Sequence, residues 1–187
     1  MSPSRDNVRV RGEFHVECFR PFKPEGNLSH DGNGQLVWEE KVHNIITTEG
    51  VQHILNTVLA GSSQIGSWHC ALVESNTTPA AAMTYQVPTF TETTSYDEAT
   101  RPVYNEAAAT TGGTVTNSAN KGVFTISATK TMFGAALLGG GTAPAVKAGT
   151  SSGGVLLCMA QFSGSRDVVD NDVVNLTYSF SAADDGV

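Results

Sequence analysis

The first clear pattern along the chain is an alternation of apolar and charged residues over residues 8–19. Valines, Phe14 and Cys18 occupy even positions, whereas arginine, glutamate and histidine occupy most odd ones. Successive side chains of a β-strand point to opposite faces, so this period predicts a half-buried strand with one charged face. Gly12 interrupts the apolar series, and we expect a β-bulge there.

A second alternating segment follows a loop rich in proline and glycine. Residues 35–46 place Leu36, Trp38 and Val42 at alternate positions among charged residues. We predict that this strand pairs with residues 8–19 as an antiparallel hairpin. The connection between them is longer than the roughly two to five residues that hairpins favour.

One segment has the period of an α-helix. Its apolar stripe consists of Val51, Ile54, Leu55, Val58 and Leu59. Thr47 or Thr48 can cap the N-terminus, Glu49 places negative charge in the first turn, and Gly61 suits a C-terminal cap. We predict a helix over residues 48–60. A helix this short is unstable alone, so we expect its stripe to pack against a sheet.

The rest of the chain is predicted as short strands joined by turns and loops. The further strands are residues 67–74, 114–117, 122–128, 130–138, 155–162 and 174–180. The almost unbroken apolar run at 155–162 is typical of a central strand buried on both faces. Residues 76–113 are rich in Thr, Ala and Pro, with short strand candidates at 87–93 and 99–105. The Gly/Ser/Thr-rich residues 139–154 predict a mobile surface loop.

Many short strands and one helix, without a repeated strand–helix–strand order, indicate a mainly β protein. We predict an antiparallel β-sandwich, of jelly-roll or immunoglobulin-like type, with one short packing helix. Residues 1–34 are predicted as an N-terminal strand with an extended arm or loop, and residues 35–187 as the sandwich. The length of 187 residues suits one domain overall.

Composition and charge narrow the classes of partner. The net charge is −7, and we expect no nucleic-acid binding, because that requires cations against phosphate. No apolar run approaches the roughly 20 residues needed to span a bilayer, and the N-terminal residues lack the apolar segment of a signal peptide. We therefore expect a protein made in the cytoplasm, with neither nucleic acid nor a membrane as partner.

One short motif matches a catalytic pattern. Residues 149–153 fit the G-x-S-x-G sequence of hydrolases, with Ser151 as the nucleophile. That chemistry needs a strand before the serine and a helix after it. Here the match lies in a low-complexity loop that leads into a strand, so we predict no catalytic residue.

Histidines, aspartates and cysteines are the candidate metal ligands. Of the five histidines only His43 and His53 are placed to meet. Asp167, Asp170 and Asp172 cluster before the last strand but lack the EF-hand pattern, and aspartate is common in turns; a weak calcium site stays open. The cysteines match no zinc motif and lie in apolar stretches, which predicts buried, unpaired thiols. We predict no metal, no cofactor and no enzymatic activity.

Basic and aromatic side chains in loops and near strand ends are candidates for binding a partner. The candidate interface comprises Arg9, Arg11, Arg20, Phe22, Lys23, Tyr85, Phe90, Tyr96, Arg101 and Tyr104. A sugar-binding platform is the alternative for six aromatic residues of the chain: Trp38, Trp68, Tyr85, Phe90, Tyr96 and Tyr104.

Four motifs, in this order, resemble a family of virion structural proteins of tailed bacteriophages. They are GQLVWEEKVHNIITTEG (34–50, continuing into Ile54 and Leu55), YDEATRP (96–102), GTVTNS (113–118) and FGAAL (133–137). The resemblance implies a β-sandwich on the capsid surface, as a cement or decoration protein that binds and stabilises the lattice of the major capsid protein.

This interpretation implies two kinds of partner. One is the major capsid protein, and the other is further copies of this chain in a trimer or another symmetric oligomer. We expect residues 1–34 and 76–113 to reach across neighbouring subunits. A tail, collar or baseplate component and a carbohydrate-binding adhesion module remain as alternatives.

Overall fold

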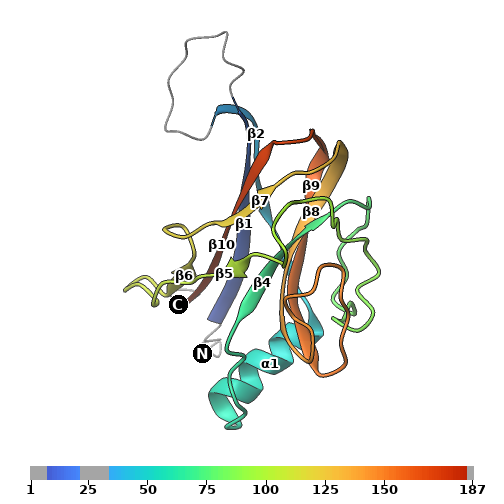
Figure 1. The fold of residues 1–187 in the computed structure, drawn as a ribbon. Helices are drawn as coiled ribbons and strands as arrows, with labels where there is room; N and C mark the ends of the chain where they lie inside the picture. The colour runs from blue at the N-terminus through green and yellow to red at the C-terminus, as the bar shows by residue number, and fades with distance from the viewer. Residues whose placement is uncertain (1–7, 22–33, 185–187) are drawn as a thin grey trace.

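The computed structural model describes residues 8–21 and 34–184. They form two antiparallel sheets of five strands each and one short helix, an open two-sheet arrangement consistent with a sandwich (Figure 1). The predicted fold class is therefore confirmed. The order of the strands, however, separates several segments that are neighbours in the sequence.

The first sheet, sheet A, is built around its first and last strands. It contains β2 (Gln35–His43), β1 (Val8–Arg20), β10 (Val173–Asp184), β6 (Thr114–Thr116) and β7 (Gly122–Thr125). β1 pairs with β10 on one side and with β2 on the other, which confirms the predicted hairpin. β6 and β7 do not pair with each other, and both pair with β10. Residues 8–20 are thus an internal strand of the sandwich.

The second sheet, sheet B, begins where the chain leaves β2. It contains β3 (Ile45–Ile46), β9 (Gly154–Val168), β8 (Lys130–Gly140), β4 (Trp68–Val73) and β5 (Val103–Tyr104). The predicted single strand over residues 35–46 is divided at Asn44, whose N–H donates to the Gly12 carbonyl at 3.2 Å. β3 then pairs with β9 in the other sheet. Strand 35–46 therefore contributes to both sheets.

The core between the sheets follows the alternation of the sequence. Its buried side chains include Phe14, Val16, Cys18, Cys70, Leu72, Leu137, Cys158, Leu176 and Tyr178. All three cysteines are free and buried, as predicted. Burial raises the pKa of the Cys18 and Cys158 thiols to about 12. These thiols are therefore protonated and unreactive at neutral pH.

Gly12 provides space for neighbouring side chains and does not form a bulge. The register of β1 with β10 runs through Gly12 without a shift, so the predicted bulge is wrong. A Cβ at Gly12 would lie 2.1 Å from Asn44 Oδ1 and 2.3 Å from the Tyr178 hydroxyl oxygen. Glycine is required because two side chains occupy the position of its missing side chain.

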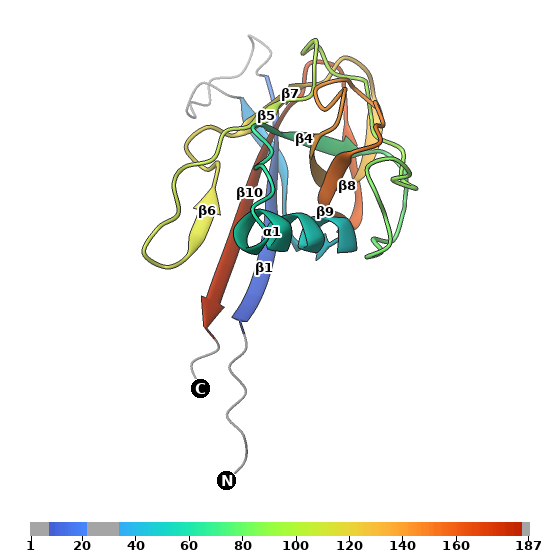
Figure 2. The ribbon, with the colours of Figure 1, turned by 90° about the horizontal axis from the view of Figure 1, so that it is seen from below.

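The outer side of sheet B is covered by a long excursion of the chain between β4 and β5 (Figures 1 and 2). A second apolar cluster forms there from Ala71, Val73, Met83, Tyr85, Phe90, Ala136, Leu138, Leu156 and Met159. β9 is therefore apolar at successive positions because both of its faces are buried, as predicted. Of the strand candidates at 87–93 and 99–105, only β5 forms, with isolated bridges at Glu92 and Tyr96.

Helix α1 (Thr48–Leu59) begins at the predicted cap. The Gly50 N–H donates to Thr47 Oγ1 at 2.9 Å. Glu49 accepts hydrogen bonds at one carboxylate oxygen from the N–H groups of Tyr85 (2.9 Å) and Leu156 (2.7 Å). The first turn of the helix thus joins the excursion to β9.

The apolar stripe of α1 faces a direction that the sequence did not indicate. Only Ile54 of the stripe packs against the core. Val51, Leu55, Val58 and Leu59 are 43%, 51%, 73% and 78% exposed, and we call these four side chains the outer face of α1. The prediction is right for the position of the helix and wrong for the burial of its stripe.

Substituting Gly50 with alanine should destabilise the protein, although alanine is the better helix former. A Cβ there would lie 2.4 Å from the Leu157 carbonyl oxygen. Because α1 must then move away from β9, we expect the free energy of unfolding to fall by about 1–3 kcal/mol, which outweighs a gain in helix propensity of about 1 kcal/mol. Denaturant unfolding measures the change, with Gln52→Ala on the exposed side of α1 as a neutral control. A more stable Gly50→Ala variant would contradict the close contact.

Candidate functional site

Five of the ten predicted partner residues lie inside the fold. Tyr85, Phe90, Tyr96, Arg101 and Tyr104 are between 1% and 8% exposed. The chain does not present these side chains on its surface, which corrects their interpretation as contact residues. Tyr85 and Phe90 belong to the second cluster over sheet B, whereas Tyr96 and Tyr104 pack in the core between the sheets.

The remaining predicted residues have different positions. Arg9 and Arg11 are exposed near the start of β1 and point to the outer side of sheet A. Arg20 is bound to a buried carboxylate, as described below. Phe22 and Lys23 lie outside the described residues.

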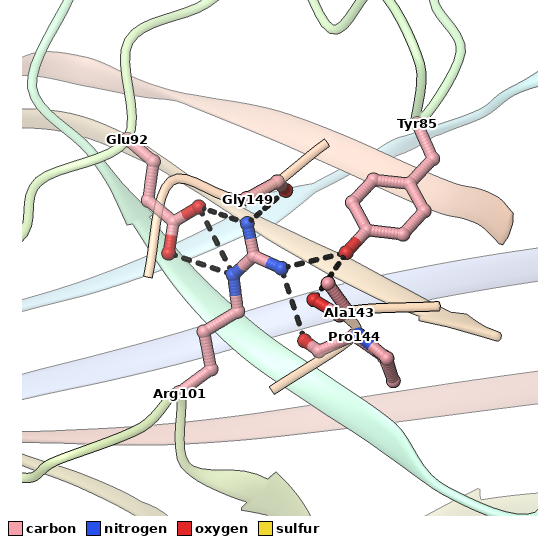
Figure 3. A network of polar contacts seen from close by, with 6 residues as sticks. All are labelled: Tyr85, Glu92, Arg101, Ala143, Pro144 and Gly149. Atoms are coloured by element: carbon pink, nitrogen blue, oxygen red, sulfur yellow. Dashed lines mark hydrogen bonds and ion pairs between the residues drawn. The ribbon is translucent and has the colours of Figure 1, made fainter. Parts of the chain in front are cut away.

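A buried cluster of polar side chains surrounds Arg101 (Figure 3). Arg101 Nε and Nη2 donate to the Glu92 carboxylate at 2.8 and 2.5 Å. Nη1 donates to the Tyr85 hydroxyl at 3.0 Å. The Tyr85 ring also lies 5.6 Å from Arg101 Cζ, within cation–π range. The three side chains connect distant parts of the excursion.

Carbonyl groups of the loop between β8 and β9 complete the coordination of the same guanidinium. Pro144 and Gly149 accept from Arg101 Nη1 and Nη2 at 3.0 and 2.8 Å. The backbone N–H of Arg101 donates to the Ala145 carbonyl at 2.8 Å. The Tyr85 hydroxyl donates to the Ala143 carbonyl at 2.9 Å. The loop predicted as mobile is therefore held by hydrogen bonds along its length.

The geometry of Arg101 gives it a structural role. Burial acts to lower the pKa of its guanidinium, but the hydrogen bonds and charge of Glu92 outweigh this and raise the pKa above its ordinary value. All five N–H donors of the guanidinium have protein acceptors. Arg101 is therefore charged and has no donor left for an external anion.

A second ion pair fixes the turn between β9 and β10. Arg20 Nε and Nη2 donate to the two carboxylate oxygens of Asp172, each at 2.8 Å, and the Val169 N–H donates to Asp172 at 2.9 Å. Burial acts to raise the pKa of Asp172, but these hydrogen bonds outweigh it and lower the pKa below its usual value. Asp172 thus stabilises a turn, which is one of the roles that the sequence suggested for the acidic cluster.

A third set of contacts ties the two sheets together at the edge formed by β2. Glu40 accepts from the Ser163 N–H at 2.9 Å and from the Arg166 guanidinium. Trp38 Nε1 donates to the Asp167 carbonyl at 3.0 Å. Within the described residues, the buried Asp, Glu and Arg side chains are Glu40, Glu92, Arg101 and Asp172. Each of them connects separate segments of the fold.

The candidate nucleophile Ser151 is hydrogen-bonded to residues of its own loop. Thr142 N–H donates to Ser151 Oγ at 2.9 Å, and the Ser151 hydroxyl donates to the Ser152 carbonyl at 3.1 Å. Among residues 8–21 and 34–184, no group of three or more His, Cys, Asp or Glu side chains is arranged to hold a metal ion. Over the same residues, no helix has the length and apolar character required to cross a membrane.

The feature that sequence reasoning missed is the exposed apolar surface around α1. A crevice of about 230 Å³ lies between this helix and the end of the sandwich. Its lining includes His53, Ile54, Val58, Trp68, Leu157 and Phe180. Val58 belongs both to this crevice and to the outer face of α1, so the two apolar surfaces are continuous. The helical period revealed the stripe, but the orientation of a stripe depends on packing that the period does not encode.

Comparisons with known proteins add no relative to this description. The chain matches no protein-family model, no curated protein and no solved structure.

Removing one member of the Arg101–Glu92 pair should destabilise the fold strongly. Arg101→Met leaves the Glu92 carboxylate buried without its cation, and we expect the free energy of unfolding to fall by about 3–5 kcal/mol. The double variant Arg101→Met/Glu92→Leu should recover part of this loss, because it buries no unpaired charge. Denaturant unfolding of both variants tests the pair. Lys121→Met, which breaks a more exposed ion pair with Glu17, is the control and should cost about 1 kcal/mol or less. Additive losses in the double variant would contradict the coupling.

The stability of the protein should depend on pH through Asp172. Because the folded state lowers the pKa of Asp172, its ionised form contributes stability above the unfolded-state pKa of about 4, and this contribution is lost as pH falls through the folded-state pKa. Asp172→Asn should therefore reduce stability at neutral pH and flatten its decline below about pH 4. Unfolding free energies across this range provide the measurement, with the exposed Asp170→Asn as control. An unchanged pH dependence in Asp172→Asn would refute the assignment.

Proposed function

We propose that this chain is a virion structural protein of a tailed bacteriophage, specifically a capsid cement or decoration protein that binds and stabilises the lattice of the major capsid protein. The order of motifs along residues 34–137 supports the family. The β-sandwich agrees with the fold that the resemblance implies. No step of this role requires a reaction, a cofactor or a metal.

The observation that carries the proposal is the use of the buried charged groups. Glu40, Glu92, Arg101 and Asp172 all bind other parts of the fold. The Arg101–Glu92 pair is buried on both sides and every guanidinium donor has an acceptor. A buried polar network that is fully hydrogen-bonded holds its segments in fixed relative positions. A domain that bridges neighbouring subunits needs this internal rigidity, because a compliant bridge would transmit little of the load between them.

In this role, binding to the capsid is strengthened by the many identical junctions of the lattice. A capsid lattice presents the same junction many times, so a contact that is weak at one junction gains effective concentration when copies are linked. The outer side of sheet A offers a polar surface for such a contact. It carries Arg9, Arg11 and Lys41 together with Glu13 and Glu39. Mixed charges of this kind favour a specific orientation more than they favour affinity.

Two other functions share parts of this evidence. A tail, collar or baseplate protein would have the same fold, and only its copy number and position differ. A carbohydrate-binding module needs aromatic rings on one exposed face. Four of the candidate rings are buried and the two tryptophans are only partly exposed, so this burial disfavours the sugar platform.

The proposal predicts that purified virions of the encoding phage contain this chain in hundreds of copies, in register with the capsid lattice. Quantitative mass spectrometry gives the copy number, and cryo-electron microscopy of the particle gives the position. A handful of copies at the tail would favour the alternative, and absence from the particle would exclude a virion role.

The attachment surface can be tested on the same particles. Arg9→Glu with Arg11→Glu should lower occupancy on capsids, because it reverses the charge at one end of sheet A. Arg9→Lys with Arg11→Lys keeps both positive charges and is the matched control, with near-normal occupancy expected. Equal occupancy of all three proteins would remove the two arginines from the contact.

A further inference from the structure

The outer face of α1 is unusual for a helix of a soluble sandwich. An amphipathic helix normally turns its apolar stripe toward the core. Here the close contact of Gly50 with Leu157 sets which side of the helix meets β9, and four of the five stripe residues face away from the core. Figure 2 looks onto this end of the sandwich and shows α1 lying across it on the viewer's side.

We propose that a second copy of this chain covers the outer face of α1, helix against helix across a two-fold axis. The four side chains recur at i, i+4, i+7 and i+8 from Val51 to Leu59, so they form one line along the helix. Such a line packs against another helix. In a two-fold contact the same residues from both copies meet.

The lack of charged residues along α1 after Glu49 and in the segment that follows the helix fits a homotypic contact. No Asp, Glu, Lys or Arg occurs between Glu49 and Glu74, in a chain whose net charge is −7. Among the described residues that line the crevice, the one carboxylate is Glu106. Two identical acidic proteins repel each other unless they meet through an uncharged surface. The neighbours of the outer face, such as Gln52, Asn56 and Ser62, are uncharged and suit the polar rim of an interface.

The exposed apolar area of the outer face is large enough to form the centre of such an interface. From their exposed fractions, the four side chains offer about 400 Å² of apolar surface, as much as the largest patch on many monomers. A stable interface buries about 800 Å² per partner. The outer face therefore provides roughly half of this area, and the uncharged rim and the mouth of the crevice at Val58 and Trp68 extend it.

A membrane surface is the less suitable occupant. Amphipathic helices that lie on anionic lipid carry Lys or Arg on their polar side. α1 carries neither, and its single carboxylate, Glu49, accepts two backbone hydrogen bonds. The inference deepens the proposed function, because a cement protein requires associating copies, but its test uses purified protein without any particle.

Sedimentation velocity of the full chain over about 1–100 µM should show a reversible dimer or a larger assembly built from it. Leu55→Glu with Leu59→Glu should produce a monomer, with the dissociation constant raised at least about 100-fold. Glutamate forms helices well, and circular dichroism with thermal unfolding checks that the variant is folded. Val123→Glu, at a 41% exposed valine on β7, away from α1 (Figure 1), is the matched control and should associate like the wild type.

Cross-linking gives a second measurement that does not depend on a destabilising charge. Cysteine introduced by Leu55→Cys should form a disulfide-linked dimer under mild oxidation, whereas Val123→Cys should not. A wild-type chain that is monomeric throughout the concentration range would overturn the inference. So would assembly that persists in Leu55→Glu/Leu59→Glu. Either result would leave capsid attachment unaffected, since occupancy on particles is measured separately.

Discussion

Sheet B is apolar on both faces, and this constraint determines how the rest of the chain is arranged. One face meets sheet A, and the other would be exposed if no further layer covered it. The excursion between β4 and β5 supplies that layer through Met83, Tyr85 and Phe90. An irregular segment packed on a sheet must also satisfy its polar groups. The buried guanidinium of Arg101 does this by binding Glu92, Tyr85 and the carbonyls of the loop between β8 and β9 at one point.

The elements with a strong period were predictable from the sequence. β1, β10 and α1 lie within a few residues of their predicted positions because alternation and helical spacing are local properties. The non-local features were not predictable. The division of residues 35–46 between two sheets depends on Asn44 meeting Gly12. The pairing of β6 and β7 with β10 depends on a strand about 50 to 65 residues away in the sequence.

The predicted contact residues illustrate the same limit. Arginine is mostly exposed in folded proteins, and Arg101, Tyr85 and Phe90 lie in a segment without a strong period, so the sequence predicts them at a surface. Their burial follows from the second apolar face of β9, which the sequence did contain, although it did not show which segment would cover that face. The outer face of α1 is the converse case: a stripe that normally indicates burial is exposed because a glycine contact sets the rotation of the helix.

The pairing of β1 with β10 also has a consequence for biosynthesis. These strands form the longest ladder of sheet A, although they stand near opposite ends of the described chain. β6 and β7 join the sheet only through β10, so sheet A remains incomplete until β10 has emerged from the ribosome. Until then a nascent chain lacks the β10 neighbours of β1, among them the Tyr178 ring that packs against Phe14. The core between the sheets is therefore completed late in synthesis.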